Sequence, residues 1–181
     1  MSLKDLSGTY VLDPAHTRVG FSARHAMVTK VRGAFNDVSG TANVDGRNPG
    51  ASNVQVTINV ASFDTRNEGR DGHVKSADFL DAENYPTITF ASTSVVQTGD
   101  DEVEITGDLT IKDVTRSLTI PFTFEGEATD PFGNHRIGFE GGVAISRADY
   151  GITWNAALET GGVLVSDKVN LEFEVSAIKQ A

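Results

Sequence analysis

The stretch Val103-Glu-Ile-Thr-Gly-Asp-Leu-Thr-Ile111 alternates strictly between apolar and polar residues. This period of two is the repeat of a β-strand, because successive side chains point to opposite faces of a sheet. One face of the stretch carries Val103, Ile105, Gly107, Leu109 and Ile111. The other face carries only acidic residues and threonines. The stretch therefore predicts a strand with one buried face and one solvated face.

The same alternation recurs along the chain, in segments joined by turn-forming residues such as Asn48-Pro-Gly50 and Gly99-Asp-Asp101. Each segment has one apolar face, so the sheet must close on itself or pack against a second sheet. Because the segments follow one another as hairpins, we predict an all-β fold, an antiparallel up-and-down (lipocalin-like) barrel of about eight strands. Neither an internal repeat nor a linker divides the chain, and we assign residues 1–181 to one domain.

A barrel of about eight strands is wide enough to be filled by its own side chains or to hold one small ligand. Four small residues, Gly40, Ala42, Gly107 and Gly141, fall on the predicted inward faces. They are consistent with an open lumen. They are equally consistent with β-bulges and close strand packing, so the residues alone leave both alternatives open.

Between residues 67 and 86 the alternation stops, and we predict one short helical excursion there. Asp71 and Ser76 are residue types favoured at a helix N-cap, and Asp71 and Lys75 have the spacing of an ion pair on one helix face. Tyr85 precedes a proline, which disfavours helix at that position. Val74, Phe79 and Leu80 are expected to pack against the barrel and help to close it.

The same excursion contains Asp71, His73, Ser76 and Asp78, the residue types of a nucleophile, a base and an acid. On a helix, however, Asp71 and His73 would point to different sides. The chain also lacks the nucleophile elbow of hydrolases, the zinc-protease motif and the phosphate-binding loop. We therefore predict structural roles for these residues and no catalytic residue in this segment.

Two charged residues, Arg147 and Asp167, fall in phase with apolar faces near the end of the chain. If the last two strands pair with Ile145 opposite Val169, Arg147 lies opposite Asp167. We predict an ion pair at the barrel end near Trp154, either structural or as an anchor for a ligand head group.

His25 is also in phase with an apolar face. We expect a buried histidine with a satisfied hydrogen bond, or a donor to the polar head of a ligand in an apolar pocket. The four histidines are dispersed, and no pair has the spacing of zinc ligands, so we predict no metal site.

The formal net charge is −10, and the chain has no cysteine. A nucleic-acid-binding protein needs a basic surface, so we exclude that class, and an anionic membrane would repel so acidic a protein. The first residues lack the apolar core of a secretion signal, and no apolar run could span a membrane. We predict a cytoplasmic protein without membrane insertion; an exported protein that had lost its signal would have the same sequence.

Several short motifs occur in a characteristic order and spacing. They are Leu12-Asp-Pro-Ala-His-Thr17, Gly33-Ala-Phe35, Ser62-Phe-Asp-Thr65, Arg70-Asp-Gly-His-Val-Lys-Ser-Ala-Asp-Phe79, Tyr85-Pro-Thr-Ile-Thr-Phe90, Gly107-Asp-Leu-Thr-Ile111 and Arg147-Ala-Asp-Tyr-Gly151. Over almost its whole length the sequence thereby resembles the YceI-like family of polyisoprenoid-binding, lipocalin-like proteins. Tyr10, Thr17 and Leu80 depart mildly from the family pattern, which more often has Trp, Ser and Phe there.

The resemblance implies a barrel whose apolar lumen takes the tail of a long isoprenoid or related lipid, such as a quinone side chain. It implies a non-catalytic carrier or store that needs no cofactor, and it allows a homodimer. Two other readings of the barrel are an enzyme acting on a lipid-like substrate, through His25 or through Asp71 with His73, and a ligand-free structural or stress-related protein.

The predicted ligand-binding residues are the larger residues of the inward faces, together with three residues near the mouth. An apolar tube suffices for such a ligand, because each buried CH₂ group contributes roughly 0.8 kcal/mol. The inward residues are Phe21, Val56, Ile58, Phe90, Ile105, Leu109, Ile120, Phe122, Phe139, Val143, Leu171 and Phe173, and those at the mouth are His25, Arg147 and Trp154.

Overall fold

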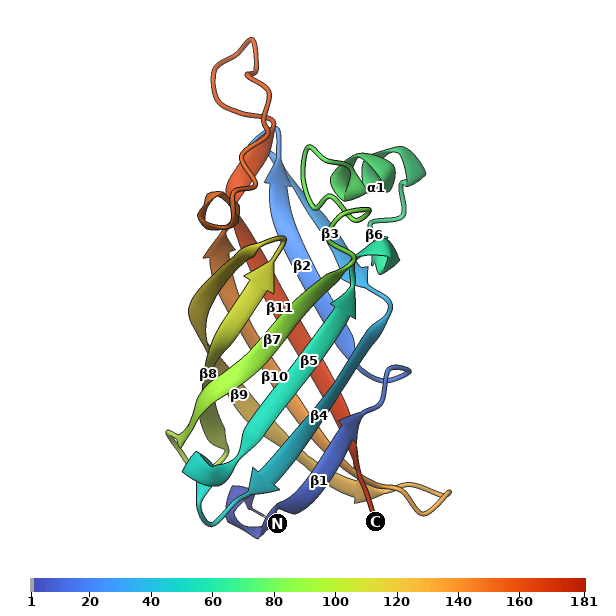
Figure 1. Cartoon of the computed structure of the whole chain (residues 1–181), viewed down its shortest axis with the longest axis vertical. Helices are drawn as coiled ribbons and strands as arrows, with labels where there is room; N and C mark the ends of the chain where they lie inside the picture. The colour runs from blue at the N-terminus through green and yellow to red at the C-terminus, as the bar shows by residue number, and fades with distance from the viewer. Residues whose placement is uncertain (1) are drawn as a thin grey trace.

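Long antiparallel strands wind around a common axis and close into a barrel in the computed structural model, which describes residues 2–181 (Figure 1). The eight-stranded up-and-down barrel predicted from the alternation is confirmed. The strands are β1 (Ser7–Leu12), β2 (Arg18–His25), β3 (Thr29–Phe35), β4 (Val38–Asp45), β5 (Asn53–Asn59), β6 (Phe63–Asp64), β7 (Thr87–Gln97), β8 (Glu102–Ile111), β9 (Val114–Thr129), β10 (His135–Ser146) and β11 (Val165–Lys179).

Three of the eight barrel strands are interrupted along their length. β1 and β2 form the two halves of one, β3 and β4 of the next, and β5 and β6 of the third. Both β1 and β2 pair with β11, which closes the barrel. β7 pairs with β5, and each of the strands β8 to β11 pairs with the strand that precedes it in the sequence, as a meander requires.

The register of the last hairpin agrees with the prediction. Ile145 lies opposite Val169, and Val143 lies opposite Leu171. A slip of one residue would turn the apolar face of β11 outward, so the alternation defines this register.

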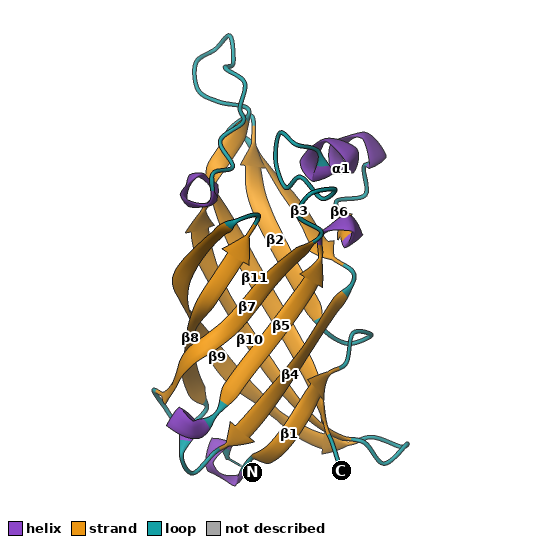
Figure 2. Cartoon of the chain, viewed as in Figure 1, coloured by secondary structure: helices purple, strands orange, loops and turns teal. Residues whose placement is uncertain are grey.

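Helices lie at the two ends of the barrel and leave the wall to the strands (Figure 2). The α-helix is α1 (Glu68–Lys75), and the 3₁₀ turns are η1 (Leu3–Asp5), η2 (Pro49–Ala51), η3 (Val60–Ser62) and η4 (Arg147–Tyr150). None of the helices within residues 2–181 has the length and apolar character needed to cross a membrane.

The buried apolar residues form one cluster at each end. The cluster at the α1 end contains Val19, Val38, Ile58, Val60, Phe79, Ile88, Leu109, Ile111, Tyr150 and Ile152, with Val74 and Leu80 packed against it. The segment of α1 therefore packs against the barrel end as predicted. The opposite cluster contains Leu3, Leu6, Tyr10, Phe124, Ile137 and Ala177, so η1 closes that end.

The capping of α1 differs from the prediction. Asn67 is the N-cap, and its side-chain oxygen accepts a hydrogen bond from the Arg70 amide at 2.9 Å. Ser76 follows the last turn instead of opening it. Asp71 is buried against Thr65 and forms no ion pair with Lys75 within the described chain. The next strand, β7, starts at Thr87 as predicted, but α1 ends at Lys75, before Tyr85, and the polar residues of the excursion have different partners.

β9 and β10 separate toward the α1 end of the barrel. Their pairing ends at Phe122 opposite Gly141, so the first part of β9 pairs with β8 alone. The turn η4 lies beside this gap, and its Tyr150 and the following Ile152 are buried in the core. Side chains from a loop thus complete the wall where backbone pairing stops.

Candidate functional site

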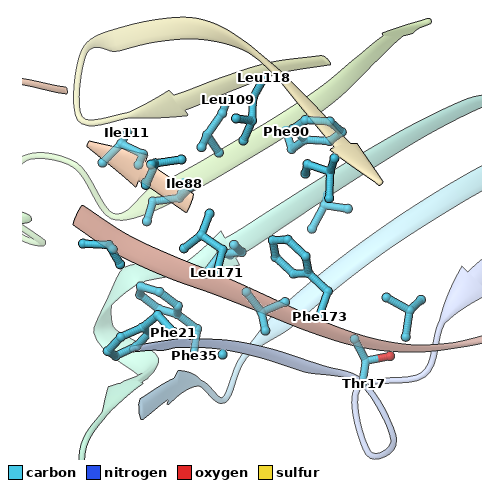
Figure 3. A pocket seen from close by; sticks show the side chains of 18 of the residues that line it. Thr17, Phe21, Phe35, Ile88, Phe90, Leu109, Ile111, Leu118, Leu171 and Phe173 are labelled. Carbon is cyan, nitrogen blue, oxygen red and sulfur yellow. The ribbon is translucent and has the colours of Figure 1, made fainter. Parts of the chain in front are cut away.

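A cavity of about 750 Å³ occupies the interior of the barrel. Ligand sites of drug-sized molecules span roughly 300–1,000 Å³, so the space is large enough for a substantial ligand. Apolar side chains point into it from opposite walls, Phe90 and Leu118 from one side and Leu171 and Phe173 from the other (Figure 3). These inward side chains stay partly accessible because no other side chain fills the space between them.

Nearly all residues predicted to line a lumen do line this cavity. They include the aromatic and aliphatic residues of the inward faces and also His25, Arg147 and Trp154. Val143 is the exception among the described residues: it lies opposite Leu171 in the sheet but is not part of the cavity lining.

The lining also contains residues that the sequence analysis did not single out. Ile88, Ile111 and Ile145 share faces with predicted lining residues, and the alternation was sufficient to find them. Phe35 and Phe63 sit at strand ends, where the period of two gives no signal. Their rings join that of Phe21 in an aromatic cluster, in which the Phe21 and Phe63 ring centroids are 4.9 Å apart.

Phenylalanine rings lie on top of inward glycines. A Cβ added to Gly141 would come within 2.5 Å of the Phe122 ring, and one added to Gly107 within 2.5 Å of the Phe90 ring. Phe122 is the direct cross-strand partner of Gly141. The absence of a side chain on the glycine lets the ring lie close to the wall, a device known from the aromatic covering of glycines in β-sheets.

The two alternatives for the small inward residues are therefore both realised. The glycines do serve close packing, and through that packing they keep aromatic rings out of the middle of the barrel. The outcome is an open lumen with an aromatic wall.

The α1 end of the cavity is closed by aromatic side chains from two segments distant in sequence. The ring of His73 lies edge-on to that of Trp154, with centroids 4.6 Å apart, and to that of Phe79 at 5.1 Å. All three residues line the cavity. The guanidinium carbon of Arg147 lies 5.9 Å from the Phe79 ring centroid, a cation–π geometry.

Arg147 binds backbone and not a carboxylate. Its side chain is only 7% exposed, and burial lowers its pKa. Its guanidinium donates to the carbonyls of Ile152, Trp154, Val165 and Ser166, at 2.9, 2.9, 3.2 and 2.9 Å. These carbonyls belong to both ends of the loop that follows η4. Arg147 therefore fixes this loop, and with it Trp154, over the end of the barrel.

The predicted ion pair between Arg147 and Asp167 is wrong. The Asp167 carboxylate accepts hydrogen bonds from the Ser146 hydroxyl at 2.6 Å and from the Ala148 amide at 3.0 Å. These bonds, the Ser146 bond foremost, lower the pKa of Asp167. The pairing of β10 with β11 ends at Ser146 opposite Lys168, and Arg147 begins the turn η4, so its side chain reaches other partners.

His25 is exposed and not buried, which corrects the expectation for this residue. It ends β2 and lines the cavity at its margin. Its backbone carbonyl accepts hydrogen bonds from the turn that follows, including one from the Val28 amide at 3.1 Å. The in-phase position of His25 placed it on the correct face, but at the last residue of β2, where its side chain is exposed.

The polar residues of the α1 segment hold the segment together. The Ser76 hydroxyl donates to the His73 carbonyl at 2.6 Å, while the His73 imidazole contacts the Asp78 carboxylate at 2.9 Å. The Asp71 carboxylate accepts from the amide and the hydroxyl of Thr65. Within residues 2–181, His, Asp and Glu side chains nowhere gather in a group of three that could hold a metal ion.

Comparison with known proteins places this geometry in a family. The family model described as YceI-like domain matches residues 10–177. Protein YceI of Escherichia coli is 40% identical over 165 residues, which cover 91% of this chain and 83% of that protein. The crystal structure of BcnA from Burkholderia cenocepacia superposes with a TM-score of 0.80 at 27% identity, over 91% of this chain and 98% of that one.

A second solved structure is a polyisoprenoid binding domain from Saccharophagus degradans, with a TM-score of 0.73 over 94% of this chain and 98% of that one. At 16% identity it shows the likeness of the fold alone. The family match across residues 10–177 and the identity to the Escherichia coli protein agree with the motifs and the barrel described above. This chain belongs to the YceI-like family.

Proposed function

We propose that the protein is a non-catalytic carrier or store that holds the tail of a long apolar ligand in its barrel. The ligand class is a polyisoprenoid, an isoprenoid quinone or a similar lipid. The observation that carries the proposal is the cavity of about 750 Å³ with its almost entirely apolar lining. The Saccharophagus degradans structure, named for polyisoprenoid binding, supports the same ligand class.

The chemistry of the lining suits a long hydrocarbon tail. Each CH₂ group moved from water into the cavity contributes roughly 0.8 kcal/mol, and a long tail brings many such groups. The mid-barrel wall contributes Ile105, Leu109, Ile120 and Leu171, which have no polar side-chain atoms and so give no basis for selecting a short polar molecule.

The roles of polar residues at the α1 end of the barrel, in and next to the cavity lining, also support a carrier. Arg147 donates to backbone carbonyls, and the Asp71 carboxylate accepts from Thr65. The hydroxyl of Ser76 is bonded to a backbone carbonyl and not to the His73 ring. The geometry thus favours holding a ligand over transforming it.

The proposal is tested by organic extraction of the purified protein followed by mass spectrometry. We expect an isoprenoid lipid or quinone from the wild type. The variant Leu171→Trp adds a large ring inside the cavity and should yield much less. Val96→Trp adds the same ring on the exposed outer face and should yield as much as the wild type.

Equal recovery of lipid from both tryptophan variants would overturn the proposal, as would repeated extraction of no lipid from the wild type. Far-ultraviolet circular dichroism and a urea unfolding curve show whether Leu171→Trp is folded. A folded variant without lipid attributes the loss to the filled cavity.

A further inference from the structure

The turn between β2 and β3 exposes large apolar side chains to solvent. Met27 is 63% exposed and Val28 is 75% exposed. Ala26 and Met27 both adopt positive φ, 49° and 64°, the left-handed conformation of tight hairpin turns. Residues other than glycine rarely adopt it, so the chain keeps the exposed side chain of Met27 on a conformation with a steric cost.

A second segment adds to this exposed apolar surface. The loop of residues 155–164 rises beside the end of β2 and beyond it (Figure 1). The sulfur of Met27 lies against Gly162, where a Cβ would clash with it, and Val163 is exposed beside it. Met27, Val28 and Val163 are called the apolar tip below.

The strands just behind the apolar tip carry basic residues. Arg24 lies opposite Lys30 in the sheet, and Arg32 follows two residues later, so all three share the outer face. All three are exposed, and within residues 2–181 none has a carboxylate within 4.0 Å. These three are called the basic flank.

The basic flank stands out against the rest of the molecule. Residues 24–32 contain three positive and no negative side chains, while the whole chain has a net charge of −10. The neighbouring loop contributes a single acidic residue, Glu159. The nearby Asp167 carboxylate is already bonded to Ser146 and to the Ala148 amide. Positive charge is therefore concentrated on the β2–β3 hairpin itself, while the α1 segment at the same end of the barrel carries Glu68, Asp78, Asp81 and Glu83.

The cavity reaches the base of this tip. Ala23 and His25 of β2 line it, as does Leu164, whose carbonyl accepts a hydrogen bond from the Ala26 amide at 2.8 Å. A hydrocarbon chain that leaves the barrel at this margin emerges between the hairpin and the loop, beside the apolar tip.

We propose that the apolar tip docks on the surface of an anionic lipid bilayer. Met27, Val28 and Val163 would enter the head-group region, while the basic flank stays at the level of the lipid phosphates. Binding of this kind depends on buried apolar area together with electrostatic attraction to anionic lipid. The acidic remainder of the protein is repelled by the same surface, which orients the molecule with the tip toward the bilayer.

This inference goes beyond ligand binding, because docking requires no ligand in the cavity. It also refines the argument from net charge. The total of −10 predicts repulsion of the protein as a whole, whereas the local distribution selects the β2–β3 hairpin for contact. The cavity margin then faces the membrane from which an apolar ligand is taken or to which it is delivered.

Vesicle co-sedimentation with the full-length protein tests the proposal. The vesicles consist of phosphatidylcholine alone, or of phosphatidylcholine and phosphatidylglycerol at a three-to-one ratio, without isoprenoid. We expect binding to the anionic vesicles that weakens with salt, and much weaker binding to the neutral ones.

Two double variants separate the contributions of charge and of apolar surface. Lys30→Gln with Arg32→Gln should weaken binding by about fivefold for each charge removed. Met27→Ser with Val28→Ser should weaken binding to the anionic vesicles and abolish what remains to the neutral ones. The substituted side chains are exposed, so the urea midpoints should match that of the wild type.

Matched controls lie at the opposite end of the barrel. Lys4→Gln with Arg47→Gln removes the same charge, and Phe132→Ser removes an apolar side chain that is 89% exposed. Both should bind like the wild type.

The proposal is overturned if the wild type does not bind anionic vesicles, or if tip and control variants lose binding equally. It is also overturned if the tip variants change only the elution volume in gel filtration, which would assign the tip to a contact between copies of the chain.

Discussion

At the scale of single residues, the polar groups around the cavity hold the protein in shape. Arg147 is buried beside an apolar space, yet its charge is solvated by four backbone carbonyls, two from the loop that carries Trp154 and two from the start of β11. Removing the donor of these hydrogen bonds leaves the carbonyl acceptors buried and unsatisfied. The free-energy cost of this is larger than the net stabilisation that the bonds provide.

The variant Arg147→Met keeps much of the side-chain volume and removes all of these donors. We expect the free energy of unfolding to fall by roughly 3 kcal/mol, because buried carbonyls lose hydrogen bonds to a charged group. Urea denaturation measures the change, and hydrogen exchange should speed up in residues 152–165. Arg116→Met is the matched control, since Arg116 is half-exposed and donates to one carbonyl, that of Asp149. A similar loss of stability in both variants would contradict the anchoring role.

A second residue-scale feature is the ring of Phe122 lying on Gly141. Gly141→Ala should lower the free energy of unfolding by about 1–3 kcal/mol, because the new methyl group would lie 2.5 Å from the Phe122 ring and 2.7 Å from the Pro121 carbonyl oxygen. Gly138→Ala in the same strand is the control: its nearest neighbours would be at 3.8 Å, and we expect a change within about 0.5 kcal/mol. If urea midpoints shift equally for both, the ring does not depend on the glycine.

Arg136 joins three segments near the opposite end of the barrel. Its guanidinium bonds Asp13 and also Asp130, the latter at 2.7 Å. The hydrogen bond from Arg136, with a second from His16, lowers the pKa of Asp13 from 3.8 to about 2. A folded-state pKa below the unfolded one gives stability that is present above the unfolded value and lost as the pH falls through the folded one.

We therefore expect the urea midpoint to decline as the pH falls from about 4 to about 2. Arg136→Met removes the largest single cause of the lowered pKa of Asp13, so this decline should become shallower. Arg18→Met, which breaks an exposed pair with Glu172 at 3.8 Å, should leave the slope unchanged. Parallel pH profiles for the wild type and Arg136→Met would rule out this account of Asp13.

At the scale of elements, the segment around α1 covers one end of the barrel. A short polar link, the hydrogen bonds of Asp71 and Arg70 to Thr65, holds it there. Asp71 binds the amide and hydroxyl of Thr65, and Arg70 binds the same hydroxyl and the Thr65 carbonyl. This link seats the helix, and Phe79 and Leu80 then pack on the barrel end. Val74 and the contact of His73 with Trp154 add to this packing, because so short a helix depends on tertiary contacts.

Asp71→Ala should loosen this cover without unfolding the barrel wall. We expect a loss of about 2 kcal/mol in the free energy of unfolding, with faster hydrogen exchange confined to residues 65–80. Asp78→Ala removes an exposed carboxylate that contacts His73, and the expected change is within about 0.5 kcal/mol. Uniformly faster exchange around the whole barrel after Asp71→Ala would show that the link serves the wall as well.

The sequence was most informative about the strands. Alternation placed Ile145 opposite Val169, because a one-residue slip would expose an entire apolar face. It could not assign the N-cap of α1, where Asn67, Asp71 and Ser76 are all suitable residue types and the outcome depends on tertiary partners. The partners of Arg147 were equally hidden, because backbone carbonyls are present at every residue and leave no signal in the sequence.

At the scale of the whole molecule, side chains fill the two ends of the barrel and leave its middle as an open cavity. The N-terminal turn with Leu3 and Leu6 fills one end, and Phe79 with Trp154 covers the other. Between these clusters the strands supply an apolar wall around about 750 Å³. The family match accounts for the fold, while the proposed ligand follows from the size and chemistry of this space.

The most direct test of the central claim is calorimetric titration with isoprenoid alcohols of increasing length. We expect the binding free energy to grow by up to about 0.8 kcal/mol for each buried CH₂ group and to level off once the cavity is full. Leu171→Trp should level off at a shorter chain, and Val96→Trp at the same length as the wild type. An affinity independent of chain length, or the same limiting length in Leu171→Trp as in the wild type, would contradict the claim that the barrel interior holds the ligand.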